Sequence, residues 1–221
     1  MNKIKLVIFD MDGLMIDSES VYIKVTKNTA KQLKIPFDEK KFYKTIGTSV
    51  KDAIKIYGSI MGEKYYLTTF RDVYLKNRTE YLEKHPYKKK KGIITLLKYL
   101  KKNDIKIAVA SSTYKDFATD SLTKIGAIDY IDFGLFGDAV KRSKPDPEIY
   151  LKVLKHYKDI DPSEVLVFED SKNGLLAATN AHLKCVVIPD VCFIPKAILK
   201  KAYRIYPDLT YGIKLIKELN K

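Results

Sequence analysis

The chain has 221 residues, which is enough for one sizeable domain or for a core domain with a smaller insert. Hydrophobic residues make up 46% and charged residues 31%, as in an ordinary folded protein, and no low-complexity stretch suggests a disordered arm. The formal net charge is +14, but apart from the short run 88–91 the lysines are spread along the whole chain, so we expect no nucleic-acid partner.

The chain shows no sign of export or of membrane insertion. Cys185 and Cys192 are too few for a disulfide framework, and a reducing compartment suits them. The apolar stretch within residues 1–10 is too short for a signal peptide, and no segment approaches the length of a membrane span. We therefore expect a cytoplasmic protein without membrane association, and a monomer as the default.

Short apolar runs rich in β-branched residues predict buried strands, and helical patterns lie between them. The predicted strands are 5–10, 105–110, 133–136, 165–168 and 185–188. The predicted helices of the same region are 93–102, 116–125, 147–156, 173–181 and 213–219. Buried strands that alternate with helices indicate a parallel sheet covered on both faces, and right-handed crossovers then give a Rossmann-like, doubly wound α/β fold.

One stretch interrupts this alternation. Between residues 18 and 86 the sequence predicts helices only, at 19–33, 42–43, 50–57 and 65–84. We predict a helical cap domain over 18–86, inserted into an α/β core formed by 1–17 and 87–221. An insert joined by two linkers can open and close over a site at the edge of the sheet.

Polar residues follow the predicted strands at their carboxyl ends, where open parallel sheets form their sites. A loop before one predicted helix adds a lysine to this set. The candidate residues are Asp10, Asp12, Ser111, Ser112, Lys144, Glu169 and Asp170.

The chemistry that needs such a set is phosphoryl transfer through an aspartyl-phosphate. A carboxylate nucleophile, Asp10, must approach a phosphate that is already negative, so a divalent cation is required between them. Oxygen ligands suit Mg²⁺, and Asp10 and Asp170 would supply carboxylates while the backbone carbonyl of Asp12 supplies a further oxygen.

The remaining candidates have complementary roles. Ser111 would donate a hydrogen bond to a phosphate oxygen, with Ser112 beside it. Lys144 would place a positive charge by the phosphate and Asp10. The side chain of Asp12, two residues past the nucleophile, would protonate the leaving oxygen and later activate water.

Four runs carry a resemblance to a known family. The runs 9–14 (FDMDGL), 109–112 (VASS), 143–147 (SKPDP) and 167–174 (VFEDSKNG) resemble, in order, the four motifs of the haloacid dehalogenase (HAD) superfamily. The resemblance covers essentially the whole chain. It implies magnesium, the aspartyl-phosphate step, and a role for Glu169 in binding or orienting the metal beside Asp170.

The helical insert resembles the cap of the β-phosphoglucomutase-like subgroup. The run 17–19 (DSE) is similar to its entry into the cap, and 46–49 (IGTS) is similar to its substrate-specificity loop, which makes Gly47 a candidate substrate contact. The run 188–190 (IPD) resembles the end of the last main strand in its small-molecule phosphatases, including pseudouridine-5′-phosphatase-like proteins.

Two departures from the mutase pattern decide the predicted reaction. Tyr22 stands where β-phosphoglucomutases carry a histidine, and Val50 stands where they carry an arginine that holds the distal phosphate. We therefore predict a magnesium-dependent phosphatase that hydrolyses a small phosphomonoester, such as a sugar phosphate or a nucleotide.

Three alternatives stay open. Lys51 could replace the missing arginine, which keeps a phosphosugar mutase possible. A non-catalytic basic binding protein on a HAD scaffold is an alternative of another class, although the intact acidic residues and Lys144 argue against it. A dehalogenase would not need the Glu169–Asp170 metal pair.

Overall fold

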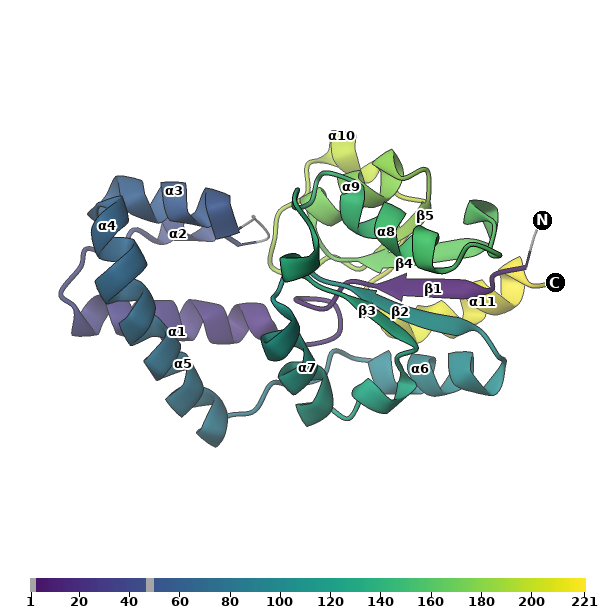
Figure 1. Ribbon diagram of the computed structural model, residues 1–221, viewed down its shortest axis with the longest axis horizontal. Coiled ribbons are helices and arrows are strands. Elements are labelled where there is room, and N and C mark those ends of the chain that lie inside the picture. Colours follow the sequence, from purple (N-terminus) through teal and green to yellow (C-terminus); the bar gives the residue numbers. More distant parts are fainter. Residues whose placement is uncertain (1–2, 47–49) are drawn as a thin grey trace. The chain divides into compact units, whose positions relative to one another are not determined.

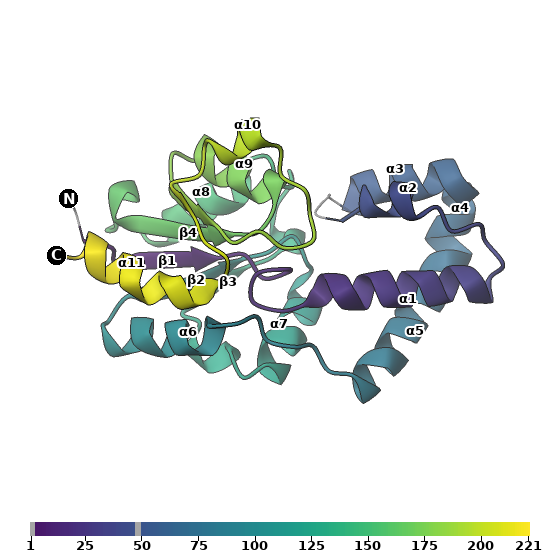
Figure 2. The ribbon, with the colours of Figure 1, turned by 180° about the vertical axis from the view of Figure 1, so that it is seen from behind.

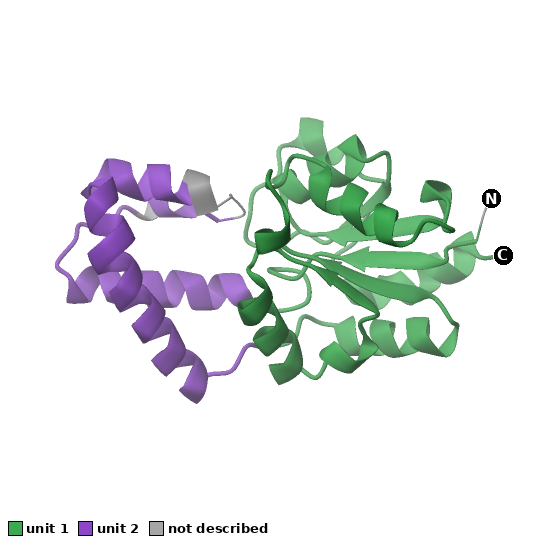
Figure 3. Ribbon diagram, in the orientation of Figure 1, with its two compact units in different colours: residues 1–16, 89–221 green, residues 17–88 purple. Residues whose placement is uncertain are grey.

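A computed structural model describes residues 3–46 and 50–221 of the chain. The chain divides into two compact units, Met1–Ile16 with Lys89–Lys221 and Asp17–Lys88 (Figure 3). That the second unit acts as a cap stays a prediction.

Among the described residues, six strands of the first unit form one parallel sheet in the order β3-β2-β1-β4-β5-β6 (Figure 1). The predicted doubly wound α/β fold is confirmed. Five strands lie where the apolar runs predict them, whereas the sixth is only two residues long and too short to give a pattern. The bounds are β1 (Leu6–Phe9), β2 (Lys106–Ala110), β3 (Phe133–Leu135), β4 (Val165–Glu169), β5 (Lys184–Val187) and β6 (Arg204–Ile205).

The register brings three strand ends together. Phe9, the last residue of β1, pairs with Val109 of β2 on one side and with Phe168 of β4 on the other. The chain continues from β1 toward β2 but from β4 toward β5, so the strand order reverses between β1 and β4. In open α/β sheets this is the point at which ligands bind.

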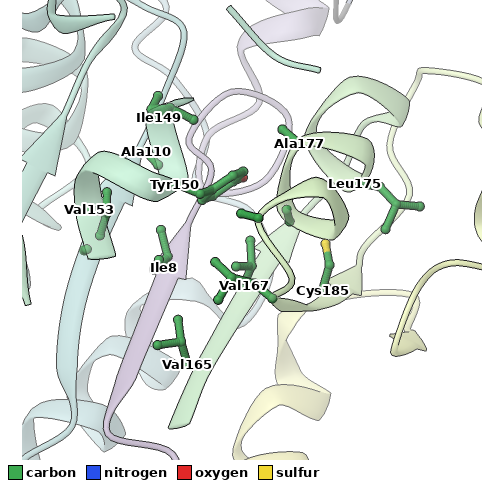
Figure 4. Packing of buried hydrophobic residues seen from close by; sticks show 14 of the residues in the cluster. Ile8, Ala110, Ile149, Tyr150, Val153, Val165, Val167, Leu175, Ala177 and Cys185 are labelled. Atoms are coloured by element: carbon green, nitrogen blue, oxygen red, sulfur yellow. The ribbon is translucent and has the colours of Figure 1, made fainter. Parts of the chain in front are cut away.

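Helices cover both faces of the sheet (Figures 1 and 2). On one face lie α8 (Glu148–His156), α9 (Lys172–Asn180) and α10 (Lys196–Leu199), and on the other lie α6 (Ile93–Lys102), α7 (Lys115–Lys124) and α11 (Gly212–Leu219). The first face buries an apolar core in which Ile8 and Val167 of the sheet pack with Tyr150 of α8 and Leu175 of α9 (Figure 4).

The start of α9 is fixed by a local hydrogen bond. The hydroxyl of Ser171 accepts the amide hydrogen of Gly174, at 3.0 Å, and so caps the helix directly behind the end of β4. The polar residues that close β4 are thereby held between a strand and a capped helix, in a fixed position at the edge of the sheet.

The second unit is helical, as predicted. The predicted helix over 65–84 is interrupted, because a π-helical segment separates two α-helices. An aromatic core explains the packing: Tyr57 stacks on Tyr66 with ring centroids 4.7 Å apart, and Phe42 is buried. Its elements are α1 (Ser18–Gln32), α2 (Glu39–Tyr43), α3 (Val50–Met61), α4 (Glu63–Tyr65), η1 (Tyr66–Phe70) and α5 (Arg71–Lys84). Throughout the described part of the chain, we find no helix with the length and apolar character needed to cross a membrane.

Candidate active site

Lys144 contacts three strand ends of the candidate site. Its ammonium donates hydrogen bonds to Oδ1 of Asp10 at 2.6 Å, to Oε1 of Glu169 at 2.6 Å and to the carbonyl of Ala110 at 2.9 Å. Its side chain is only 6% exposed. The structure thus joins a loop before α8 to the ends of β1, β2 and β4, as the order of polar residues predicts.

Glu169 is completely buried and holds several neighbours in place. Tyr150 donates its hydroxyl hydrogen to Oε1 of Glu169 at 2.5 Å, beside the contact from Lys144, and the amide of Asp170 faces Oε2 at 3.2 Å. Gly174 leaves the space that this side chain occupies, since a Cβ there would lie 1.9 Å from Glu169 Cδ. Our sequence reasoning missed Tyr150, whose place in an amphipathic helix marks it only as an apolar core position.

Three carboxylates meet at this edge of the sheet. Asp10, Glu169 and Asp170 are all buried and each offers one oxygen such that these oxygens lie within 4.8 Å of one another. Gly13 makes room for the group: its φ is +78°, and a Cβ would lie 2.3 Å from Oδ2 of Asp170. A glycine is required here both by the left-handed backbone and by the close approach of the carboxylate.

Asp12 lies in a separate hydrogen-bonded group. Its Oδ2 accepts hydrogen bonds from the hydroxyls of Thr113 at 2.8 Å and Ser111 at 3.2 Å, and Ser111 Oγ in turn accepts the amide hydrogen of Thr113 at 3.0 Å. The two hydroxyls orient the carboxylate. The group of Asp10, Glu169 and Asp170 is defined by side-chain oxygens. Binding of the ion by the backbone carbonyl of Asp12 therefore stays a prediction.

Ser112 and Gly47 are the other two residues that the sequence predicts to contact the substrate. Ser112 is half-buried, and its carbonyl borders Gly137, where a Cβ would lie 2.1 Å away, so its role in phosphate binding stays a prediction. Gly47 and the side chains of Val50 and Lys51 lie outside the described residues.

Tyr22, which replaces the histidine of the mutases, is described within the second unit. Its hydroxyl shares hydrogen bonds with the hydroxyls of Tyr57 at 2.9 Å and Thr45 at 3.2 Å. Burial raises the pKa of Tyr22, and this residue therefore remains neutral inside a network of hydroxyl groups.

Burial sets the protonation of the buried cluster. It raises the pKa of the Asp10 carboxyl to about 8; Lys144 opposes this effect, while Glu169 and Asp12 add to it. Burial also lowers the pKa of Lys144, but the charges of Asp10 and Glu169 outweigh burial and raise it. The lysine is therefore a permanent cation, and ionisation of Asp10 near neutral pH depends on additional positive charge.

Comparison with known proteins matches residues 7–188 to a family model described as haloacid dehalogenase-like hydrolase. The chain belongs to the haloacid dehalogenase-like hydrolase family. The HAD match spans the strands and helices from β1 to the end of β5, including all the candidate residues named above.

Relatives and solved structures of the HAD family agree with this assignment. The chain is 34% identical over 182 residues to a "Phosphorylated carbohydrates phosphatase" of Thermotoga maritima, covering 80% of this chain and 82% of the relative. It is 30% identical over 192 residues to "(DL)-glycerol-3-phosphatase 2" of Arabidopsis thaliana, covering 83% and 79%. A crystal structure of a "putative beta-phosphoglucomutase" from Thermotoga maritima superposes with a TM-score of 0.80 at 30% identity, covering 97% and 99%. The chain is thus an enzyme, a HAD-family phosphatase with β-phosphoglucomutase-like neighbours.

Proposed function

We propose that this phosphatase hydrolyses small phosphomonoesters of the sugar-phosphate or nucleotide type, through an aspartyl-phosphate on Asp10 and with Mg²⁺ as cofactor. The observation that carries the proposal is the contact of Lys144 with both Asp10 and Glu169, each at 2.6 Å, beside the carboxylate of Asp170. A nucleophile, a fixed cation and further acidic ligands are thereby within reach of one phosphate group.

The donor set fits a magnesium ion. Carboxylates of Asp10, Glu169 and Asp170 lie close together and Lys144 contacts two of them, so a divalent cation would offset the remaining repulsion. Asp10 and Asp170 would bind the ion with the carbonyl of Asp12, and Glu169 would orient these ligands. When bound, the ion supplies the positive charge that lets a carboxylate approach a phosphate.

The residues of the chain then divide the reaction between them. A carboxylate oxygen of Asp10 attacks phosphorus and the ester bond to the alcohol breaks, while Asp12 protonates the leaving oxygen. Asp12 next takes a proton from water, whose oxygen attacks the aspartyl-phosphate, releasing inorganic phosphate and restoring Asp10. Lys144 and Ser111 hold the phosphate oxygens throughout, with Ser112 as a further donor.

The names of the relatives support a small phosphorylated metabolite as substrate. One relative is named for phosphorylated carbohydrates and another for glycerol 3-phosphate. The formal net charge of +14 attracts anionic ligands of this kind. We assign substrate selection to the helical cap of residues 18–86 with its loop around Gly47, and we keep a cytoplasmic, monomeric enzyme as a prediction.

A phosphosugar mutase is the second candidate, because a β-phosphoglucomutase-like structure is among the neighbours at 30% identity. The hydroxyl network of Tyr22 favours the phosphatase, since this position offers no imidazole for proton transfer. A mutase would convert β-glucose 1-phosphate to the 6-phosphate with a bisphosphate primer, whereas a phosphatase releases inorganic phosphate.

A phosphate-release screen over a panel of phosphorylated metabolites tests the proposal. It includes p-nitrophenyl phosphate, and glucose 1-phosphate with and without the bisphosphate. EDTA should abolish release and Mg²⁺ should restore it.

Asp10→Asn should remove turnover with the fold intact, while Asp129→Asn, at an exposed position, should behave as wild type. Turnover by the Asp10→Asn variant would exclude Asp10 as the nucleophile, and a wild type inactive on the whole panel would favour the binding-protein alternative.

A further inference from the structure

Asp190, in the loop after β5, carries a carboxylate whose two oxygens have different surroundings. Lys90 donates a short hydrogen bond to Oδ1. The other oxygen, Oδ2, is buried and has no hydrogen-bond partner among the described residues. A buried carboxylate oxygen without a donor is unfavourable, so Oδ2 requires a donor from its surroundings.

Oδ2 of Asp190 faces the candidate magnesium site. The position that a Cβ of Gly13 would occupy lies 3.3 Å from Oδ2 of Asp190 and 2.3 Å from Oδ2 of Asp170. Asp170 and Asp190 each offer a carboxylate oxygen within 4.8 Å of the other. One water molecule between two carboxylate oxygens can donate a hydrogen bond of about 2.8 Å to each of them.

Lys90 anchors this arrangement from behind. Its ammonium binds Asp190, and its backbone amide donates to the carbonyl of Met15 at 3.0 Å. The same residue thus fixes both the loop that contains Gly13 and the carboxylate that approaches it. The ion pair also offsets the charge of Asp190, which reduces its repulsion from Asp170.

We propose that Asp190 is a positioning residue of the magnesium site, whose Oδ2 accepts a hydrogen bond from a water of the ion's hydration shell. The inference rests on the proposed function, in which Asp170 is a ligand of the ion. Mg²⁺ keeps several waters when it binds to proteins, and these waters need acceptors in a buried site. Such outer partners typically change metal affinity by about 10–100-fold.

Titration calorimetry of MgCl₂ into the metal-free enzyme tests this role without any turnover. Asp190→Asn keeps the shape of the side chain and removes its charge, and it should weaken Mg²⁺ binding about tenfold. Asp208→Asn is the matched control, because Asp208 forms the same kind of ion pair with the neighbouring Lys91, at 2.9 Å. The control should bind Mg²⁺ as the wild type does.

A third variant separates the role of Oδ2 from that of the ion pair. Lys90→Gln breaks the pair but leaves Asp190 in place, and it should bind Mg²⁺ at least as tightly as the wild type. An equal loss of affinity in Lys90→Gln and Asp190→Asn would overturn the proposal, since the ion pair alone would then explain the effect. Asp190→Ser, with the same expected loss, replaces Asp190→Asn if that variant folds poorly.

The outcomes also separate this inference from the proposed function. An Asp190→Asn variant that binds Mg²⁺ within twofold of a binding wild type would overturn the role of Asp190 alone. A wild type that does not bind Mg²⁺ would overturn the magnesium assignment and this inference with it.

Discussion

The ammonium of Lys144 lies 2.6 Å from Oδ1 of Asp10, although the two residues are 134 positions apart in the chain. Asp10 follows the central strand β1, and Lys144 lies in the loop before α8. Both are buried, so the charge of Lys144 depends on its carboxylate partners, and ionisation of Asp10 depends on nearby positive charge. We therefore expect substitutions of either residue to change both the stability and the turnover of the enzyme.

Replacing Lys144 should therefore damage the fold as well as the reaction. Lys144→Met leaves Asp10 and Glu169 buried without their cation, and unfolding in urea with EDTA present should show a loss of about 3 kcal/mol. At saturating Mg²⁺ we expect kcat to fall by about a hundredfold or more. Lys91→Met, which breaks the exposed pair with Asp208, should change neither quantity measurably. Equal stability of Lys144→Met and wild type would show that the buried pair is not coupled to folding.

Tyr150 should matter through its hydroxyl rather than its ring. Tyr150→Phe keeps the apolar packing on the sheet but removes the donor to Glu169, and the free energy of unfolding should fall by about 2 kcal/mol. Tyr157→Phe is a close control from the end of the same helix, because its buried hydroxyl has no partner among the described residues. That variant should stay within about 0.5 kcal/mol of wild type or become more stable. Identical effects of the two substitutions would contradict a specific role for the Tyr150 hydroxyl.

Two glycines with similar backbones should respond differently to alanine. Gly13 has φ +78° and Gly126 has φ +68°, so a side chain at either position is strained by about 1–2 kcal/mol. A Cβ at Gly126 would contact nothing within 4 Å, whereas at Gly13 it would lie 2.3 Å from Oδ2 of Asp170. We expect Gly13→Ala alone to weaken Mg²⁺ binding, measured by calorimetry. Unchanged Mg²⁺ affinity in Gly13→Ala would mean that Asp170 is not held by this contact.

The raised pKa of Asp10, about 8, predicts how the metal-free enzyme responds to pH. The unfolded chain loses this proton near pH 4, but the folded chain keeps it, so stability falls as the pH rises from about 4 to about 8. The slope from this group is at most about 1.4 kcal/mol per pH unit. In EDTA, wild type should therefore lose stability with pH faster than Asp10→Asn, as followed by urea unfolding at a series of pH values. Parallel pH curves for the two proteins would contradict a protonated Asp10, and Mg²⁺ should reduce the difference because its charge favours the ionised carboxylate.

The main strands and the edge at which the site forms follow from residue patterns alone. Apolar runs such as 165–168 predict buried strands between amphipathic helices, and the polar residues after them are then expected to meet where parallel strands end. The candidate acidic residues and Lys144 followed from this logic together with the order of the four motifs. The short strand β6 was not predicted, because its two exposed residues show no hydrophobic periodicity.

The pairing of the side chains, in contrast, depends on how the helices pack on the sheet. Tyr150 reads as a core residue in a helix, and its bond to Glu169 appears only when α8 packs on the end of β4. Asp190 belongs to the run 188–190 after a predicted strand, and its approach to Asp170 depends on the space left by Gly13. The physical reason is that periodicity reports which face of an element is buried, whereas hydrogen bonds between distant residues depend on distances of a few ångströms that packing alone sets.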